Sequence, residues 1–395
     1  MAILLNNINY KLMNKLLLIA FIAFLIPKLS YSKEPIISGK FTSEFFDNYT
    51  YDSTNKDNEF NEDYLRLKLA LKVNFSKNLY LNSQFSFKEI NTSSEKIRRA
   101  SSPDNGDDIS FENHALYIKK LNLNYDYKNA TFLAGKFSTK FGQSWTRKDN
   151  IWIFEEARNN YREDEKLGFA SYLKAGDKKT IGKYNFGLAV FNNDIKIFDG
   201  SIITRRDGTD KSDGVPGDER GLKSYITSMD INYEFQKDEE LSYHFSYINL
   251  AVDKNHSPIA KEKIDDMEGY ALNMNYKYPF HKNFIGEGFI EYVNLNNYAG
   301  NTDSDKDFLT TLLKLNFFNN YYITVGRYFE KEKELGTNGV DRDVKELNFG
   351  YKFNDNSFLK NLHLMAGIKR EKTDEKTSKS INEVAGVRIR YEYKF

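Results

Sequence analysis

The sequence contains no cysteine and only six prolines in 395 residues. Without thiols the protein cannot form disulfides, hold a thiolate-bound metal or carry a lipid on cysteine. Neither sign of charge is in excess, because 57 Lys and Arg stand against 56 Asp and Glu, and nothing indicates nucleic acid as a partner. The most apolar run, 16–26, is shorter than the roughly 20 residues of a membrane-spanning helix.

That apolar run lies in a segment typical of secretory signals. Lys15 precedes it, and the small residues Ser30 and Ser32 follow it, which matches the charged region, apolar core and cleavage site of a signal peptide. We therefore predict a signal peptide over 1–32, with Met13 as the true start, and one mature domain over 33–395. A secreted chain without an apolar helix is either soluble or a closed membrane β-barrel.

The mature chain is dominated by an alternation of apolar and polar side chains. In "YLRLKLALKVNF" the leucines fall on one side and Arg66, Lys68 and Lys72 on the other, as in a strand with two different faces. A helix would spread the leucines over its whole circumference. The alternation predicts sixteen strands, at 37–49, 64–75, 79–89, 112–127, 130–138, 167–174, 183–192, 223–235, 241–251, 267–278, 284–296, 307–317, 321–330, 344–353, 360–370 and 383–395.

The connections between these strands alternate in length. Short turns such as 76–78 and 128–129 are followed by long polar loops such as 90–111 and 193–222. An even-stranded membrane barrel has this arrangement, whereas a soluble sandwich has no reason to sort its loops by length. No proline interrupts a predicted strand, and Pro279 is expected in a short turn. The sequence therefore predicts an all-β fold, a sixteen-stranded antiparallel transmembrane β-barrel with short periplasmic turns and long extracellular loops.

Aromatic residues make up 15% of the sequence and gather beside the predicted short turns, as Tyr125 and Tyr127 do. Aromatic rings are typical of the membrane–water interface, where an apolar ring and a polar tip are both satisfied. A Lys or Arg that faces lipid at mid-bilayer costs roughly 2–4 kcal/mol. We therefore expect the leucine side of each strand to face lipid and the charged side to face a water-filled lumen. A register shift near Lys119–Lys120 predicts a β-bulge in 112–127.

The end of the chain, "VRIRYEYKF", is an alternating strand that finishes at Phe395. Together with the signal peptide, the sixteen strands and the loop pattern, it resembles the bacterial outer-membrane porins. The stretch "AGKFSTKFG" (134–142) is similar to the Gly-(Arg/Lys)-Phe…Phe-Gly element of the phosphate-selective O/P-type porins. Thr139 and Lys140 precede the second phenylalanine, where that family has a proline.

The resemblance implies a passive diffusion channel for small hydrophilic solutes or ions in the outer membrane of a Gram-negative bacterium. It also implies a homotrimer in contact with outer-membrane lipid and lipopolysaccharide, and assembly by the barrel-assembly machinery through Phe395. No cofactor, metal site or catalytic residue follows from it.

The predicted loop 139–166 contains both tryptophans of the protein, Trp145 and Trp152, and many charges of both signs. In trimeric porins the third loop folds into the lumen and narrows it, and charged rings at a constriction set ion preference. We predict the same role here; the alternative is a loop packed on the barrel mouth with solvated charges. The predicted pore-lining and constriction residues are Lys40, Arg66, Lys68, Lys72, Arg147, Lys148, Glu155, Glu156, Arg158, Arg162, Arg388 and Arg390.

The first and last strands pair when a barrel closes, so the inward charges of the first, second and last strands form one mainly basic wall. If Glu155 and Glu156 face that wall, a transverse field crosses the channel. The alternative is a merely polar wall that tunes nothing in particular.

Two other classes of function remain open from sequence. One is a surface protein, an adhesin or structural barrel plugged by its loops. The other is a barrel enzyme, for which His244 between Ser242 and Ser246 is the best candidate. Same-strand neighbours two residues apart lie about 7 Å from each other with parallel side chains, so no hydrogen-bonded activation is expected there.

Overall fold

The computed structural model describes residues 36–89, 109–111, 114–193, 200–201, 215–217, 219, 221–254, 263–334, 339–354, 359–375 and 378–395. The predicted signal peptide, 1–32, lies outside the described residues. In the described part of the chain, no helix has the length and apolar character needed to cross a membrane.

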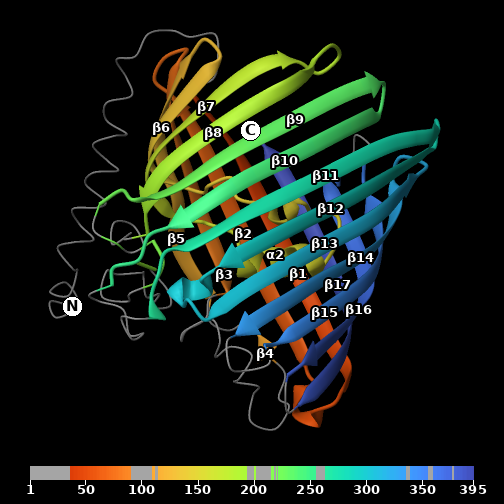
Figure 1. Cartoon of the computed structure of the whole chain (residues 1–395). Helices are drawn as coiled ribbons and strands as arrows, with labels where there is room; N and C mark the ends of the chain where they lie inside the picture. The colour runs from red at the N-terminus through yellow and green to blue at the C-terminus, as the bar shows by residue number, and fades with distance from the viewer. Residues whose placement is uncertain are drawn as a thin grey trace, which may run out of the picture.

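Within the described ranges, sixteen antiparallel strands pair in sequence order and close into a barrel (Figure 1). The last strand pairs with the first, from Lys40 opposite Lys394 to Ser53 opposite Asn382. A further strand of two residues, β4 (Ile109–Ser110), pairs in parallel with β2 and does not interrupt the ring, because β3 pairs directly with β5. The sixteen strands are β1 (Ile37–Ser53), β2 (Asn61–Asn74), β3 (Leu79–Glu89), β5 (His114–Tyr127), β6 (Ala130–Phe137), β7 (Lys166–Asp177), β8 (Gly182–Asn192), β9 (Ser224–Gln236), β10 (Glu239–Leu250), β11 (Met267–His281), β12 (Phe284–Asn296), β13 (Ser304–Phe317), β14 (Tyr321–Glu334), β15 (Asp341–Lys352), β16 (Leu362–Asp374) and β17 (Lys379–Lys394).

The predicted barrel and its strand count are confirmed, and the strand ends differ from the predicted ones by a few residues. The predicted bulge is also present: Lys120 pairs with Gln84 and Ile118 with Phe85, which leaves Lys119 as the extra residue. The placement of Pro279 in a turn is wrong, because β11 continues to His281. Pro279 lies where the register with β12 becomes irregular, a position where its missing N–H costs little.

The two faces of the strands differ as the alternation predicts. On β14, Ile323 and Val325 are 39% and 54% exposed on the outside. Tyr322 and Thr324, which alternate with them along the strand, are buried on the inside. The outer face is therefore apolar over most of the barrel. The inner face carries the charged side chains, and these pair with one another and with residues 138–165.

Aromatic rings gather on the outer face at both ends of the strands. At the short-turn end, Phe317 and Tyr321 stack with centroids 5.6 Å apart, and Tyr321 and Tyr351 lie 4.8 Å apart. At the long-loop end, Tyr270 and Tyr292 lie 6.0 Å apart. Two aromatic belts of this kind mark the two water interfaces of a membrane barrel.

Candidate channel constriction

Residues 138–165 join β6 to β7 and fold into the barrel. They contain the 3-10 turn η3 (Ser144–Thr146) and the helix α2 (Ile153–Asn160), and α2 lies inside the ring of strands (Figure 1). On one side of α2, Ile153, Phe154 and Ala157 are buried in an apolar cluster that includes Phe289 of β12 and Leu312 of β13. Burial of this apolar side holds the helix against the wall and leaves its charged side chains to meet the rest of the lumen.

The first half of the segment is attached to the carboxylate of Glu291, which points inward from β12. The backbone N–H groups of Gln143 and Ser144 donate to its two oxygens, the latter at 3.0 Å, and the hydroxyl of Tyr161 donates at 2.7 Å. Gly142 belongs to this attachment: its φ is +66°, and an added Cβ would lie 2.9 Å from the Tyr161 ring. The tight approach therefore depends on glycine at this position.

The second half is attached through the start of α2. The N-cap residue, Trp152, makes no capping hydrogen bond of its own. Glu346 of β15 replaces that cap, because its Oε2 accepts the backbone N–H groups of Trp152 at 2.9 Å and Ile153 at 2.8 Å. A carboxylate at a helix N-terminus satisfies free N–H donors and interacts favourably with the helix dipole.

Two arginines of the wall hold the carboxylates of α2. Arg66 of β2 donates to Glu155 at 2.7 Å and, through its Nε, to Glu89 at 2.8 Å. Arg342 of β15 meets Glu156 with both terminal nitrogens, one of them at 2.7 Å, and also donates to Glu371. These groups are almost completely buried, so each pair is shielded from solvent and strengthened by the low local dielectric.

The wall beside β1 and β17 completes the attachment. The indole Nε1 of Trp152 donates to Asn48 at 3.0 Å, and Arg388 donates to the carbonyl of Asn150 at 2.8 Å. A Cβ added to Gly386 would lie 2.6 Å from the Trp152 ring, so the wall lacks a side chain where the indole lies. Contacts with β1, β2, β12, β15 and β17 show that the segment spans the lumen.

The other predicted pore residues lie on the inward side of the strands or in the loop, and each contacts an oppositely charged group or an aromatic ring. On the β1, β2 and β17 wall, Lys68 lies 2.6 Å from Glu44, which also binds Arg388, and Lys40 lies 3.4 Å from Glu392, which also binds Arg390.

Lys72 lies 4.1 Å above the ring of Tyr80. Within the loop, Arg147 pairs with Glu287 at 2.7 Å and Lys148 with Glu392 at 3.0 Å. Arg158 pairs with Glu155 along the same helix, and Arg162 with Asp164 at 2.8 Å.

The condition for a transverse field, that Glu155 and Glu156 both face the basic wall, is met by one of the two residues. Glu155 faces the basic wall, where it contacts Arg66 directly. Glu156 faces the other way and binds Arg342 of β15. The reason is helical geometry, since consecutive residues on α2 point about 100° apart. The oppositely charged groups of the loop and the wall are thus joined in ion pairs. A net electric field across the channel therefore has to come from charged groups at the margin of this network of ion pairs.

The pKa shifts within the loop follow from this pairing. Burial alone would raise the pKa of Glu155, but the guanidinium groups of Arg158, Arg66 and Arg388 hold it well below its usual range. The pKa of Asp164 is likewise low, because Lys119 and Arg162 outweigh its burial. Burial, with Arg390 nearby, lowers the pKa of Lys148. Glu155 and Asp164 therefore remain ionised across the physiological pH range.

A polar cavity of about 450 Å³ lies beside the loop, between it and the strands β7 to β11. Its lining contains cations and amides and few apolar groups, which suits water and hydrophilic solutes. The residues that line it include Arg147, Lys174, Lys183, Asn232, His244 and Asn275.

The expectation that His244 forms no hydrogen bond with its strand neighbours is wrong. His244 Nε2 lies 3.1 Å from Ser246 Oγ, and its Nδ1 lies 2.7 Å from Asp230. The amide nitrogen of Gln143 lies 3.2 Å from the same Nδ1, which bonds to Asp230 when it is protonated and to Gln143 when it is not. Ser246 is completely buried and accepts the N–H of Gly142, so its hydroxyl helps to anchor the loop and no substrate reaches it.

The strands form a closed antiparallel ring that has an apolar outer face, a charged inner face and a loop inside it. The fold of this chain is therefore a sixteen-stranded membrane β-barrel. Comparison with solved structures gives the same fold. The outer membrane channel DcaP of Acinetobacter baumannii is similar with a TM-score of 0.51 and 11% identity, over 90% of this chain and 96% of that one. OccAB3 of Acinetobacter baumannii has a TM-score of 0.51 and 11% identity, over 91% and 99%. OmpT of Vibrio cholerae, solved in a trimer form, has a TM-score of 0.50 and 10% identity, over 90% and 98%. No protein-family model and no curated protein matches the sequence.

Several residues that hold the loop were not predicted from sequence, namely Glu287, Glu291, Arg342 and Glu346. All four lie on the inward side of strands whose alternation was readable. The alternation of apolar and polar residues predicts that these four side chains point inward. It does not say which of the inward residues lie at the depth of the loop.

Proposed function

We propose that this protein is an outer-membrane porin, a passive diffusion channel for small hydrophilic solutes or ions, in which residues 139–166 form the constriction. The observation that carries the proposal is the attachment of the segment across the lumen, from Glu291 on β12 to Arg66 on β2, with α2 held between Arg66 and Arg342 of β15. Charged groups on a fixed loop beside a charged wall are what ion selectivity at a pore requires. The polar cavity beside the loop and the similarity in fold to an outer membrane channel support the same function.

The assembly implied by this function is a homotrimer with its long loops outside the cell. OmpT, which has the same fold, has been solved in a trimer form. We further propose that the barrel-assembly machinery recognises the terminal strand through Phe395. The backbone of Phe395 exchanges two hydrogen bonds with Gly39, at 2.8 and 3.1 Å, while its ring is 52% exposed on the outer side. Before the barrel closes, the backbone groups of Phe395 are not yet paired with Gly39, so both this strand edge and the ring are accessible.

Single-channel recording in a planar bilayer tests the proposal. The wild-type protein is expected to open in stable steps, and the combined substitution of Arg66→Ala and Arg390→Ala is expected to shift the reversal potential in a salt gradient towards cations. The matched control replaces both residues by lysine, which keeps the charge and alters the pairing geometry. Only the alanine variant should change selectivity. A silent bilayer would favour a plugged structural or adhesin barrel, and an unchanged reversal potential would remove these arginines from the selectivity site.

A further inference from the structure

The outer face of the barrel carries a row of charges that the channel function does not use. Hydrogen-bonded strand pairing places one outward residue of each strand directly opposite the next, from β11 to β17. The row is uncharged on β11 to β13, basic on β14 to β16 and acidic on β17. Its members, in order, are Met274, Ile290, Thr311, Arg327, Lys345, Arg370 and Glu383.

Three cations directly opposite one another on a membrane-facing surface are unfavourable by themselves. Like charges in facing cross-strand positions repel, and each Lys or Arg on the lipid face costs up to roughly 2–4 kcal/mol, depending on depth. The side chains of Arg327, Lys345 and Arg370 are 50%, 61% and 61% exposed. Among the described residues, Arg327 and Lys345 share the carboxylate of Asp343, and Arg370 pairs with Glu383. An excess of positive charge therefore remains on this surface.

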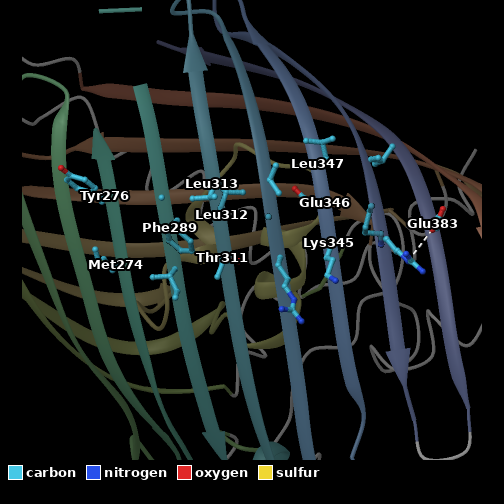
Figure 2. A pocket seen from close by; sticks show the side chains of 18 of the residues that line it. Met274, Tyr276, Phe289, Thr311, Leu312, Leu313, Lys345, Glu346, Leu347 and Glu383 are labelled. Carbon is cyan, nitrogen blue, oxygen red and sulfur yellow. Dashed lines mark ion pairs between the residues drawn. The ribbon is translucent and has the colours of Figure 1, made fainter. Parts of the chain in front are cut away.

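The row follows a groove of about 890 Å³ on the same surface (Figure 2). Figure 2 shows Met274 and Thr311 at the apolar end and Lys345 and Glu383 towards the charged end, with Leu347 beside them. Gly288 contributes no side chain to the outer face, and a Cβ there would meet only a Leu313 methyl at 3.8 Å. One end of the groove is thus cationic and the other is open and apolar.

The two ends also differ in depth. Lys345 and Arg370 each lie four residues from the long-loop end of their strands (345 from 341, 370 from 374). Met274 and Thr311 each lie seven residues from the long-loop end of theirs (274 from 267, 311 from 304). Arg327 lies seven residues from the long-loop end of β14 (327 from 334), level with Met274 and Thr311, so Lys345 and Arg370 are the two of the three cations that lie closer to the outer interface.

We infer that this groove binds a phosphorylated glycolipid of the outer leaflet, the lipid A portion of lipopolysaccharide. Its phosphates would bind Arg327, Lys345 and Arg370, because guanidinium groups bind phosphate oxygens in pairs. An acyl chain would lie along Met274 and Ile290. A second copy of the chain fits less well, since a mostly apolar outer face offers little counter-charge for the positive charge that remains beyond Asp343 and Glu383. The inference rests on the proposed outer-membrane location and is independent of conduction.

The test compares lipid binding by full-length protein refolded in detergent without lipopolysaccharide. Purified lipopolysaccharide is titrated, and bound lipid is counted by native mass spectrometry. The groove variant combines Arg327→Gln, Lys345→Gln and Arg370→Gln. The matched control combines Lys128→Gln, Lys237→Gln and Lys282→Gln, which removes the same charge from exposed short-turn positions at the other end of the barrel. We expect binding to the groove variant to weaken on the order of a hundredfold and binding to the control to stay unchanged.

A second variant keeps every charge and protects the test against misfolding. Gly288→Phe fills the apolar end of the groove and is expected to weaken lipopolysaccharide binding about tenfold, without affecting channel conductance. Three results would overturn the inference. The first is equal lipopolysaccharide binding by the groove and control variants. The second is a response of the wild-type protein to inorganic phosphate equal to its response to lipopolysaccharide. The third is loss of the oligomer in the groove variant while lipid binding is retained. Unchanged conductance in both variants separates this outcome from a failure of the channel proposal.

Discussion

The loop is attached to the barrel in two different ways. At Glu291 and Glu346 a carboxylate of the wall accepts backbone N–H groups of the loop. At Arg66 and Arg342 a guanidinium of the wall binds a loop carboxylate. The first kind depends on one side chain only, since every loop residue has a backbone to donate. The second kind depends on two side chains and adds the cost of burying both charges.

The difference indicates a division of roles. Backbone attachment fixes the path of the loop and tolerates change in the loop sequence. The ion pairs fix charged groups at defined positions in the lumen. The two partners of an ion pair can be exchanged for each other, provided that both are changed together. The predictions below remove one kind of attachment at a time.

The largest effect is expected from Arg342→Ala. This substitution removes the guanidinium that Glu156 and Glu371 share, although Lys369 still lies 3.0 Å from Glu371. Breaking a buried pair in this way costs on the order of 3–5 kcal/mol of folding free energy. Urea unfolding followed by circular dichroism measures the loss. The reversed pair, Arg342→Glu with Glu156→Arg, is the control and should recover part of the loss. A change below 1 kcal/mol for Arg342→Ala would mean that these charges are already hydrated.

A smaller effect is expected from Glu346→Ala. The variant removes the carboxylate that caps α2, and such a loss costs about 1–2 kcal/mol. Its main consequence is local, because the helix remains held through Glu155 and Glu156. Single-channel traces should show more open-state noise than wild type at similar mean conductance. Glu332→Ala, an inward carboxylate near the long-loop end of β14, serves as the control, and equal noise in the two variants would contradict a specific capping role.

The smallest effect is expected from mild acid. Because the folded-state pKa of Glu155 is held low, its pairing contributes stability above the unfolded value of about 4.3 and is lost only as pH falls through the lower folded value. The part of the conductance that depends on Glu155, measured as the difference between wild type and Glu155→Gln, is therefore expected to remain constant from pH 7 to about pH 4.5 and to change below that range. The Glu155→Gln variant should show no such acid limb. A wild-type transition near pH 5 to 6 would show that the pair is open to water.

The sequence predicted the barrel far better than its interior. Period-two alternation depends on which solvent each side meets, so it is visible in "YLRLKLALKVNF" without any neighbour. The extra residue at Lys119 was readable for the same reason, because it reverses the alternation. Glu291 and Glu346 were not singled out, since the depth of an inward residue depends on strand register and loop path, and both are set by closure of the whole ring. The opposite directions of Glu155 and Glu156 required knowledge of α2, an eight-residue helix in a segment that was predicted to be a loop.

Single-channel conductance of the wild-type protein and of a Glu291→Ala, Glu346→Ala double variant, recorded in the same bilayer, tests the central claim directly. If residues 139–166 form the constriction and are held by backbone attachment, the wild type opens in stable steps. The double variant then conducts more current per channel, with larger fluctuations. Equal, steady conductance of the two proteins would contradict a constriction at this loop.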